Sequence, residues 1–162
     1  SVMCTLSVLG LLAVSFSAMD AAGLPEGYYG SFKLDRSENF DEYLDATGIG
    51  WFKRKLITLA SVTKTFTKTG PNTFTFDNET IKKSVHYKDV VLGKEFIGEG
   101  MDSSKQKITF TFRHGQLYEK HVPTDPNADQ KEDEYAFKLE GDTLVQTLHA
   151  GAVVAKRYYE RQ

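Results

Sequence analysis

The sequence predicts an all-β fold of about ten antiparallel strands, arranged as a barrel or a sandwich, with a helical hairpin near the N-terminus. From residue 61 onward, Thr, Val, Phe and Tyr dominate, and apolar and polar residues alternate with period two. Turn-forming residues interrupt this pattern at the spacing expected of short strands. Several strands also carry polar residues on a mixed face, which favours a hollow barrel whose interior is shared by water and a ligand.

Residues 1–22 are predicted to be a secretory signal peptide that precedes a single domain over residues 23–162. The first 19 residues carry no charge, and residues 6–16 form an apolar run that is too short to span a bilayer comfortably. Small residues follow the run, as they do near a cleavage site. No Lys or Arg precedes it, and the alternative is a buried N-terminal helix of the mature fold. We expect a secreted, extracellular protein.

Composition and spacing argue against several classes of site. Cys4 is the one cysteine and lies in the predicted signal, so we expect no disulfide, no thiolate metal site and no cysteine nucleophile in the mature chain. The net charge of −2 argues against nucleic acid as a partner. Because no nucleophile–base or cofactor motif is present, we expect neither a cofactor nor an enzyme. The histidines lack metal-ligand spacing, and all four are expected on the surface: His86, His114, His121 and His149.

Two short helices are predicted before the long run of strands. The first covers residues 40–47 and ends at Gly48, and the second covers residues 51–60. The link between them is so short that they must form a helical hairpin. The apolar face of the first helix is predicted to consist of Phe40, Tyr43, Leu44 and Thr47. The inner stripe of the second is predicted to consist of Phe52, Leu56 and Leu59.

The alternation marks ten strand-like segments. One precedes the helices, over residues 31–34. The others follow them, over residues 63–69, 73–76, 84–87, 90–97, 107–113, 116–122, 133–139, 143–148 and 153–160. The sequence Asn78-Glu-Thr80 is an N-glycosylation sequon in a predicted turn, so Asn78 is a candidate site whose occupancy the sequence leaves open.

The last strand carries the most informative pattern. Period two places Arg157 and Tyr159 on one face and Lys156 and Glu160 on the other. If the second face meets solvent, a guanidinium and a phenol point into the barrel, where an unpaired cation is costly and needs an anionic partner. A ligand carboxylate fits, because Arg offers two parallel donors and Tyr a third. The alternative is an ordinary salt-bridged Arg157 with the two faces exchanged.

Several segments resemble intracellular-type fatty-acid-binding proteins, in the order in which that family has them. They are Leu34-x-x-Ser-Glu-Asn-Phe-Asp-Glu-Tyr-Leu44, Gly48-Ile-Gly50, Arg54-Lys55, Leu92-Gly-Lys-Glu-Phe96, Gly141-Asp-x-Leu144 and the terminal Arg157-x-Tyr159. The resemblance covers residues 28–162, and the signal together with the long segment 121–134 resembles the secreted nematode branch. It implies a ten-stranded, antiparallel up-and-down β-barrel with a helix-turn-helix lid near the N-terminus.

The resemblance implies that Arg157 and Tyr159 hold the carboxylate of a long-chain fatty acid inside the barrel. Tyr43 and Phe137 complete the expected ligand-binding set. Phe137 is a departure, since many members of the family carry a second internal Arg at the position that aligns with it. Lys138 could replace that cation only if the strand shifted by one residue, which would reverse every side chain. Arg157 is therefore expected to carry more of the anchoring, and the case for retinoic acid is weakened.

The portal through which the ligand enters is expected to include Trp51, Phe52 and Lys55 on the second helix. Phe52 is expected in the core, on the stripe of Leu56. Trp51 lies on another face, beside basic residues, and two alternatives stay open for it. Its side chain is either half-buried, or exposed and able to contact a membrane transiently during lipid transfer.

These expectations describe a secreted, monomeric carrier that binds long-chain fatty acids reversibly and has no nucleic-acid partner. The helical hairpin would gate the entry of the ligand. The alternatives are a lipocalin-like carrier, a retinoid carrier, and an extracellular structural or interaction protein that carries no lipid.

Overall fold

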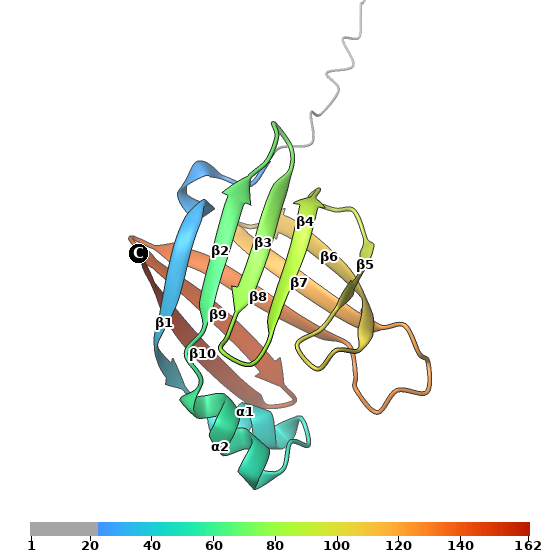
Figure 1. Ribbon diagram of the computed structural model, residues 1–162. Coiled ribbons are helices and arrows are strands. Elements are labelled where there is room, and N and C mark those ends of the chain that lie inside the picture. Colours follow the sequence, from blue (N-terminus) through green and yellow to red (C-terminus); the bar gives the residue numbers. More distant parts are fainter. Residues whose placement is uncertain (1–22) are drawn as a thin grey trace, which may run out of the picture.

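The computed structural model describes residues 23–162 and shows ten strands in one antiparallel sheet that curls into a nearly closed barrel (Figure 1). The strands are hydrogen-bonded in the order β4-β3-β2-β1-β10-β9-β8-β7-β6-β5. The expected barrel is therefore confirmed over the sandwich, and so are the up-and-down connections and the two helices. The predicted signal peptide, residues 1–22, lies outside the described residues.

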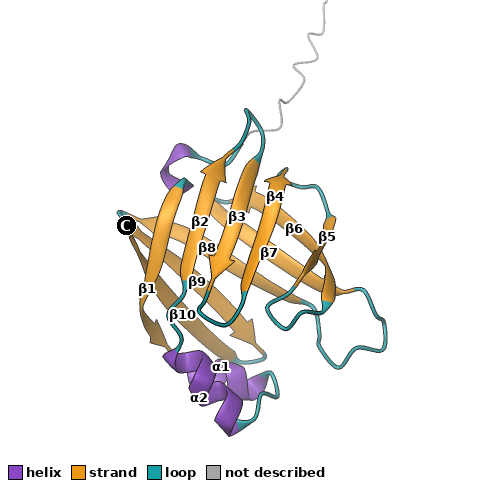
Figure 2. Cartoon of the chain, in the orientation of Figure 1, coloured by secondary structure: helices purple, strands orange, loops and turns teal. Residues whose placement is uncertain are grey.

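The first element of the described residues is a 3-10 turn, η1, at Glu26–Tyr28, and two helices follow the first strand: α1, Phe40–Ala46, and α2, Trp51–Leu59. The strands are β1 Gly30–Glu38, β2 Thr63–Lys68, β3 Phe74–Glu79, β4 Ser84–Val90, β5 Phe96–Glu99, β6 Lys105–Arg113, β7 Gln116–Pro123, β8 Asp133–Glu140, β9 Thr143–Ala150 and β10 Val153–Arg161. The helices cover one end of the barrel and η1 lies at the other (Figure 2). Neither helix in the described part is long and apolar enough to cross a membrane.

The barrel is closed by the pairing of the first strand with the last. β1 pairs with β10 along most of its length, from Phe32 opposite Arg161 to Glu38 opposite Lys156. The register shifts once, after Leu34, and such a bulge bends the strand. β4 and β5 are the two edges of the sheet and share no ladder, so side chains form the wall between them.

Two expectations about strands are wrong. Residues 90–97 do not form one strand, because β4 ends at Val90 and β5 begins at Phe96. Gly93 in between has a φ of +80°, a left-handed conformation that glycine adopts without steric cost. Asn78 lies inside β3 rather than in a turn, and its Oδ1 accepts a hydrogen bond from Lys64 Nζ at 3.1 Å. The sequon is therefore part of a paired strand.

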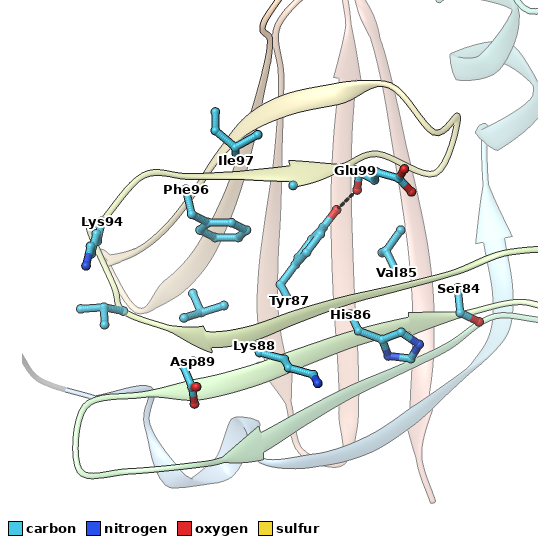
Figure 3. A pocket seen from close by; sticks show the side chains of 13 residues that line it. Ser84, Val85, His86, Tyr87, Lys88, Asp89, Lys94, Phe96, Ile97 and Glu99 are labelled. Atoms are coloured by element: carbon cyan, nitrogen blue, oxygen red, sulfur yellow. Dashed lines mark hydrogen bonds between the residues drawn. The ribbon is translucent and has the colours of Figure 1, made fainter.

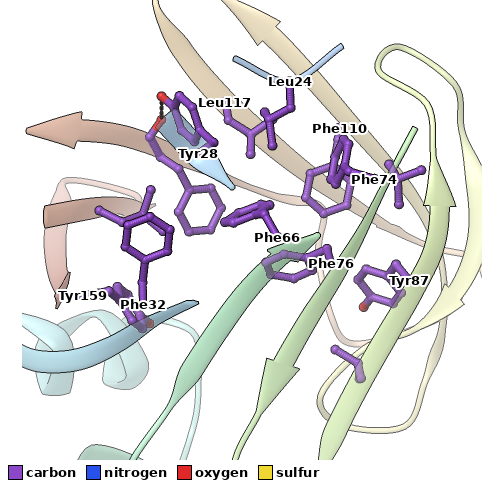
Figure 4. Packing of buried hydrophobic residues seen from close by; sticks show 14 of the residues in the cluster. Leu24, Tyr28, Phe32, Phe66, Phe74, Phe76, Tyr87, Phe110, Leu117 and Tyr159 are labelled. Atoms are coloured by element: carbon purple, nitrogen blue, oxygen red, sulfur yellow. Dashed lines mark hydrogen bonds between the residues drawn. The ribbon is translucent and has the colours of Figure 1, made fainter. Parts of the chain in front are cut away.

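Aromatic side chains fill one part of the interior (Figure 4). The ring centroid of Phe76 lies 5.0 Å from that of Phe66 and 5.4 Å from that of Phe110, and Phe110 meets Phe74 edge-on at 5.7 Å. Such pairs stabilise a core by about 0.5–1.5 kcal/mol each beyond the area they bury. We call this set the aromatic cluster: Phe66, Phe74, Phe76, Tyr87, Phe96 and Phe110. A smaller core lies under the helices and consists of Phe40, Tyr43, Leu44, Leu148 and Ala155.

Candidate functional site

The inner face of β10 carries the two residues that the alternation places there. Arg157 is 7% exposed and Tyr159 is 0% exposed, whereas Lys156 and Glu160 face solvent. The Cζ atom of Arg157 lies 5.9 Å from the centroid of the Tyr159 ring. The alternative of exchanged faces is therefore wrong. That the pair binds a carboxylate stays a prediction.

Arg157 is a buried cation with few polar partners. Its Nε donates a hydrogen bond to Oγ of Ser37 on β1 at 3.2 Å, and its Cζ lies 3.9 Å from the centroid of the Phe40 ring on α1. It forms no ion pair with any of the residues 23–162. Burial lowers the pKa of the guanidinium, but a group of such high basicity stays charged at neutral pH. Its remaining N–H donors are free to bind an anion.

Tyr159 presents a protonated hydroxyl inside the barrel. Burial raises the pKa of Tyr159 to about 12, which keeps the hydroxyl a donor over the physiological range. In this structure the hydroxyl donates to Oε1 of Gln146 on β9 at 3.0 Å. A carboxylate bound through Tyr159 therefore requires the hydroxyl to turn away from Gln146.

Phe137 also faces the interior. It lies on β8, is 0% exposed and packs edge-on against Phe66, with ring centroids 6.5 Å apart. Its neighbour Lys138 faces solvent, so the strand is not shifted by one residue. The cation that does approach the Phe137 ring is Lys64 of β2, whose Nζ lies 5.7 Å from the ring centroid.

Tyr43 is not brought together with Tyr159 and Phe137. α1 carries it into the smaller core, where its ring centroid lies 5.9 Å from that of Phe40. Its hydroxyl donates to Oδ2 of Asp133 on β8. Burial, and after it the hydrogen bond to Asp133, raises the pKa of Tyr43. The Phe40 ring lies next to both Tyr43 and Arg157, so Phe40 links the smaller core to the Arg157 side chain.

A group of polar side chains lies inside the barrel, and sequence analysis predicted only one member of it, Arg157. We call it the polar interior group, and it consists of Lys64, Gln106, Glu119, His121, Gln146 and Arg157, all buried. The alternation itself is the signal that could have found them. Lys64 stands two residues from Val62 and two from Phe66, which are both buried, and Glu119 follows buried Leu117 in the same way.

The surface position expected for His121 is wrong, while the other three histidines are exposed. The Nδ1 atom of His121 lies 2.6 Å from Oε1 of Gln106, and its Nε2 lies 2.7 Å from Oε1 of Glu119. A neutral imidazole donates to one of these oxygens, and an imidazolium donates to both. His121 donates to the Glu119 carboxylate when it is an imidazolium, and also when it is neutral with the proton on Nε2.

The two helices of the lid pack differently. α1 buries Phe40, Tyr43 and Leu44 against β9 and β10, whereas α2 buries no residue. The expected core position of Phe52 is wrong, since its side chain is 70% exposed, and Leu56 and Leu59 are exposed with it.

An ion pair explains why α2 is turned this way. Arg54 Nη1 donates to Oδ1 of Asp45 at 2.8 Å, and its Nε donates to Oδ1 of Asp41 at 3.3 Å, both on α1. Ile57, three residues further along, packs against the smaller core. These two contacts place one face of α2 against the barrel, and helical geometry then turns Phe52 outward.

The expected portal residues therefore share an exposed surface. Trp51 is 64% exposed, which excludes the half-buried alternative, and Lys55 is exposed as well. We call this surface the α2 face, and it consists of Trp51, Phe52, Leu56 and Leu59 with the basic neighbours Lys53 and Lys55.

A pocket of about 540 Å³ lies where β4 and β5 face each other without pairing in the sheet (Figure 3). Val85, Tyr87 and Phe96 line it, and the Tyr87 hydroxyl donates to the carbonyl oxygen of Glu99 at 2.6 Å. None of the expected ligand-binding residues lines this pocket.

The site can bind an anion by charge and hydrogen bonding. Arg157 supplies a cation with unused donors, and Tyr159 supplies a hydroxyl that is protonated at physiological pH. The aromatic cluster next to it offers apolar surface for a hydrocarbon chain. In the part of the chain that the structure describes, no group of three or more His, Cys, Asp or Glu side chains is placed to hold a metal ion.

Comparisons with known proteins find several fatty-acid-binding proteins that are similar to this chain. The chain is 49% identical over 154 residues to fatty acid-binding protein homolog 1 of Caenorhabditis elegans, covering 94% of this chain and 96% of the relative. The solved structure of As-p18, an extracellular fatty acid binding protein, is 41% identical and superposes with a TM-score of 0.82, covering 86% of this chain and 99% of that one. A Schistosoma mansoni fatty acid binding protein in complex with arachidonic acid is 27% identical, with a TM-score of 0.72 and coverage of 85% and 97%. No family model matches the chain.

Proposed function

The chain belongs to the fatty-acid-binding protein family, and we propose that it is a secreted carrier that binds long-chain fatty acids reversibly inside its barrel. The observation that carries the proposal is Arg157, a buried guanidinium without an ion pair in residues 23–162, beside the Tyr159 phenol. A ligand carboxylate would neutralise the cation and accept two parallel hydrogen bonds from it, and Tyr159 would donate a third.

The hydrocarbon chain supplies most of the affinity in this proposal. Burying about 14 methylenes at ~0.8 kcal/mol each contributes ~11 kcal/mol. Ordering the chain and losing its free motion cost several kcal/mol of this. The remainder corresponds to a micromolar to nanomolar dissociation constant, and the carboxylate contacts fix the orientation of the ligand.

Two observations support an extracellular role. The N-terminal 22 residues have the composition of a secretory signal, and the similar protein As-p18 is described as extracellular. The lipocalin alternative is set aside, because the chain belongs to another family. A retinoid carrier and an extracellular interaction protein without lipid are the remaining alternatives, and the next experiment separates both from a fatty-acid carrier by identifying the bound molecule.

Native mass spectrometry of the gently purified protein should detect bound fatty acid, which an interaction protein without lipid would lack. Fluorescence displacement with oleate should then give a dissociation constant that Arg157→Met weakens by about tenfold or more, because a charge-assisted hydrogen bond is lost. Arg36→Met is the matched control, since Arg36 is exposed on the neighbouring strand and pairs with Glu38. Equal affinity of the wild type and the Arg157 variant would contradict the proposed clamp.

We also propose that the α2 face contacts membranes transiently when the ligand is delivered. It exposes Trp51 and Phe52 next to Lys53 and Lys55, a combination that suits the interface of an anionic bilayer. α2 is held to α1 through Arg54 and buries no residue of its own, so its apolar side chains are available without unfolding the lid.

Transfer of a fluorescent fatty acid to phosphatidylserine vesicles tests this contact. Replacing Phe52 and Leu59 together by Ser should slow transfer by about fivefold, equivalent to losing about 1 kcal/mol of interfacial burial. The control is Val154→Ser, an exposed apolar side chain on β10. Unchanged transfer by the double variant would remove the membrane role and leave the carrier function intact.

A further inference from the structure

Lys64 is buried where a lysine is costly. Its side chain points into the barrel from β2 and is 4% exposed. The Nζ atom lies over three rings, at 5.3 Å from the centroid of Tyr159, 5.6 Å from that of Phe76 and 5.7 Å from that of Phe137. Aromatic faces attract a cation but do not replace its hydration, and the penalty for a buried ammonium is several kcal/mol.

The protein itself does not neutralise this cation. The one hydrogen bond of Lys64 goes to the neutral amide oxygen of Asn78, and within residues 23–162 it has no ion pair. Glu119 is the one buried acid among the described residues, and its carboxylate is engaged by His121 at 2.7 Å. Burial lowers the pKa of Lys64 to about 8, Glu119 partly offsets this, and Arg157 lowers it further.

The interior therefore carries excess positive charge. Lys64 and Arg157 are positive and Glu119 is negative, which leaves one unbalanced positive charge if His121 is neutral and two if it is protonated. Lys64 and Arg157 lie beside the same ring, with Nζ at 5.3 Å and Cζ at 5.9 Å from the Tyr159 centroid. An anion bound beside the Tyr159 ring would therefore be near both cations.

We propose that Lys64 is the second cation of the head-group site, so that one ligand carboxylate binds between Lys64 and Arg157 at the edge of the Tyr159 ring. The proposal rests on the fatty-acid function proposed above and adds a residue that sequence analysis missed. It explains why the fold keeps an ammonium among aromatic rings, since a bound carboxylate supplies the counter-charge that the protein lacks.

Binding should then depend on the protonation of Lys64. The titratable groups that face Lys64 are Glu119 on β7 and Arg157 and Tyr159 on β10, while β3 contributes only the neutral Asn78. With a pKa of about 8 in the free protein, Lys64 loses its charge above that pH, and oleate affinity should fall there. A bound carboxylate favours the charged form and should raise the pKa of Lys64.

The first experiment compares ligands of equal chain length at pH 7. Lys64→Met should weaken oleate binding by about 10- to 100-fold, the value of one charge-assisted hydrogen bond. It should change the binding of oleyl alcohol, which has no carboxylate, by less than about twofold. Lys68→Met is the matched control, because Lys68 lies on the same strand but is exposed and pairs with Glu26. Wild-type oleate affinity in Lys64→Met would overturn the proposal.

The second experiment uses the wild type, so that it does not depend on the folding of a variant. The ¹³Cε resonance of Lys64, assigned with Lys64→Arg, is followed against pH with and without oleate. We expect the midpoint near pH 8 to move upward when oleate is bound. An unchanged midpoint in the oleate complex would overturn the role of Lys64 alone. If Arg157→Met loses oleate affinity and Lys64→Met does not, the role of Lys64 is overturned and the carrier function is kept. A wild type that binds no oleate would overturn both the role of Lys64 and the carrier function.

Discussion

The aromatic cluster and the polar interior group line the same barrel but relate to the fold in opposite ways. In the aromatic cluster every side chain contributes to stability, because apolar area is buried and rings pack edge-on at centroid distances such as the 5.7 Å between Phe74 and Phe110. In the polar interior group Lys64 and Arg157 are buried without an ion pair in the described chain, which costs stability. The two regions meet at Lys64, which lies over the Phe76 ring.

The difference shows which residues the fold needs and which it retains at a cost. A protein selected for stability alone would extend the aromatic cluster across the interior, since apolar replacements for buried ions are often stabilising. That it keeps two cations there points to a ligand rather than to the fold. Removing a ring from the aromatic cluster and removing a cation from the polar interior group should therefore have effects of opposite sign on the free energy of unfolding.

The largest effect is expected in the aromatic cluster. Phe110→Ala should lower the free energy of unfolding by about 3–5 kcal/mol, because it removes a fully buried ring and leaves a cavity between Phe74 and Phe76. Urea unfolding monitored by fluorescence measures this. Phe52→Ala is the matched control, since it makes the same chemical change at an exposed position and should cost less than about 0.5 kcal/mol. Similar losses in the free energy of unfolding of Phe110→Ala and Phe52→Ala would contradict the prediction that burial in the aromatic cluster stabilises the fold.

The next effect has the opposite sign. Lys64→Met should raise the free energy of unfolding at pH 7 by about 3 kcal/mol, the equivalent of a pKa lowered from 10.5 to about 8. Between these pH values the unfolded chain binds more protons at this residue than the native chain, so the stability of the wild type rises with pH. The gain from the substitution should therefore shrink above pH 8 and vanish near pH 10.5. A gain that is constant from pH 7 to pH 10.5 would show that folding does not lower the pKa of Lys64.

The smallest effect is expected at Glu119. Glu119→Gln should lower stability at pH 7 by roughly 1–2 kcal/mol, because the amide can keep the hydrogen bond with His121 while the negative charge is lost. The pKa of Lys64 should fall below its wild-type value, since Glu119 is the group that raises it. The ¹³Cε titration of Lys64 measures this shift. If the midpoint of the Lys64 titration is the same in Glu119→Gln as in the wild type, Glu119 does not stabilise the charged form of Lys64.

The parts of the fold that follow from period-two alternation could be predicted. Arg157 and Tyr159 are assignable to the inner face because Lys156 and Glu160 occupy the outer one and the alternation along that strand is regular. The same alternation places Lys64 and Glu119 inside, but a polar side chain at an inner position is easily taken for a sign of an exposed face. Placing Lys64 and Glu119 inside requires knowing that the barrel interior has room for polar groups, and this depends on the tertiary structure rather than on the local sequence.

The orientation of α2 could not be predicted from its apolar residues. Phe52, Leu56 and Leu59 recur at helical spacing, which in an isolated pattern indicates the buried face. The structure instead turns Arg54 toward α1, where Asp41 and Asp45 bind it, and these are contacts between two helices rather than within one. His121 was misplaced for a related reason, because its partner Gln106 comes from the neighbouring strand.

The unpaired edges of β4 and β5 have a consequence for how the barrel accommodates ligands of different bulk. Between all other neighbouring strands, backbone hydrogen bonds fix the distance from one strand to the next. At this seam the strands are joined by side chains, such as the Tyr87 hydroxyl on the Glu99 carbonyl, and can separate without unzipping a ladder. The barrel can therefore widen between β4 and β5. In hydrogen exchange, deuterium should enter the edge amides of these two strands before it enters the amides of β1 and β10.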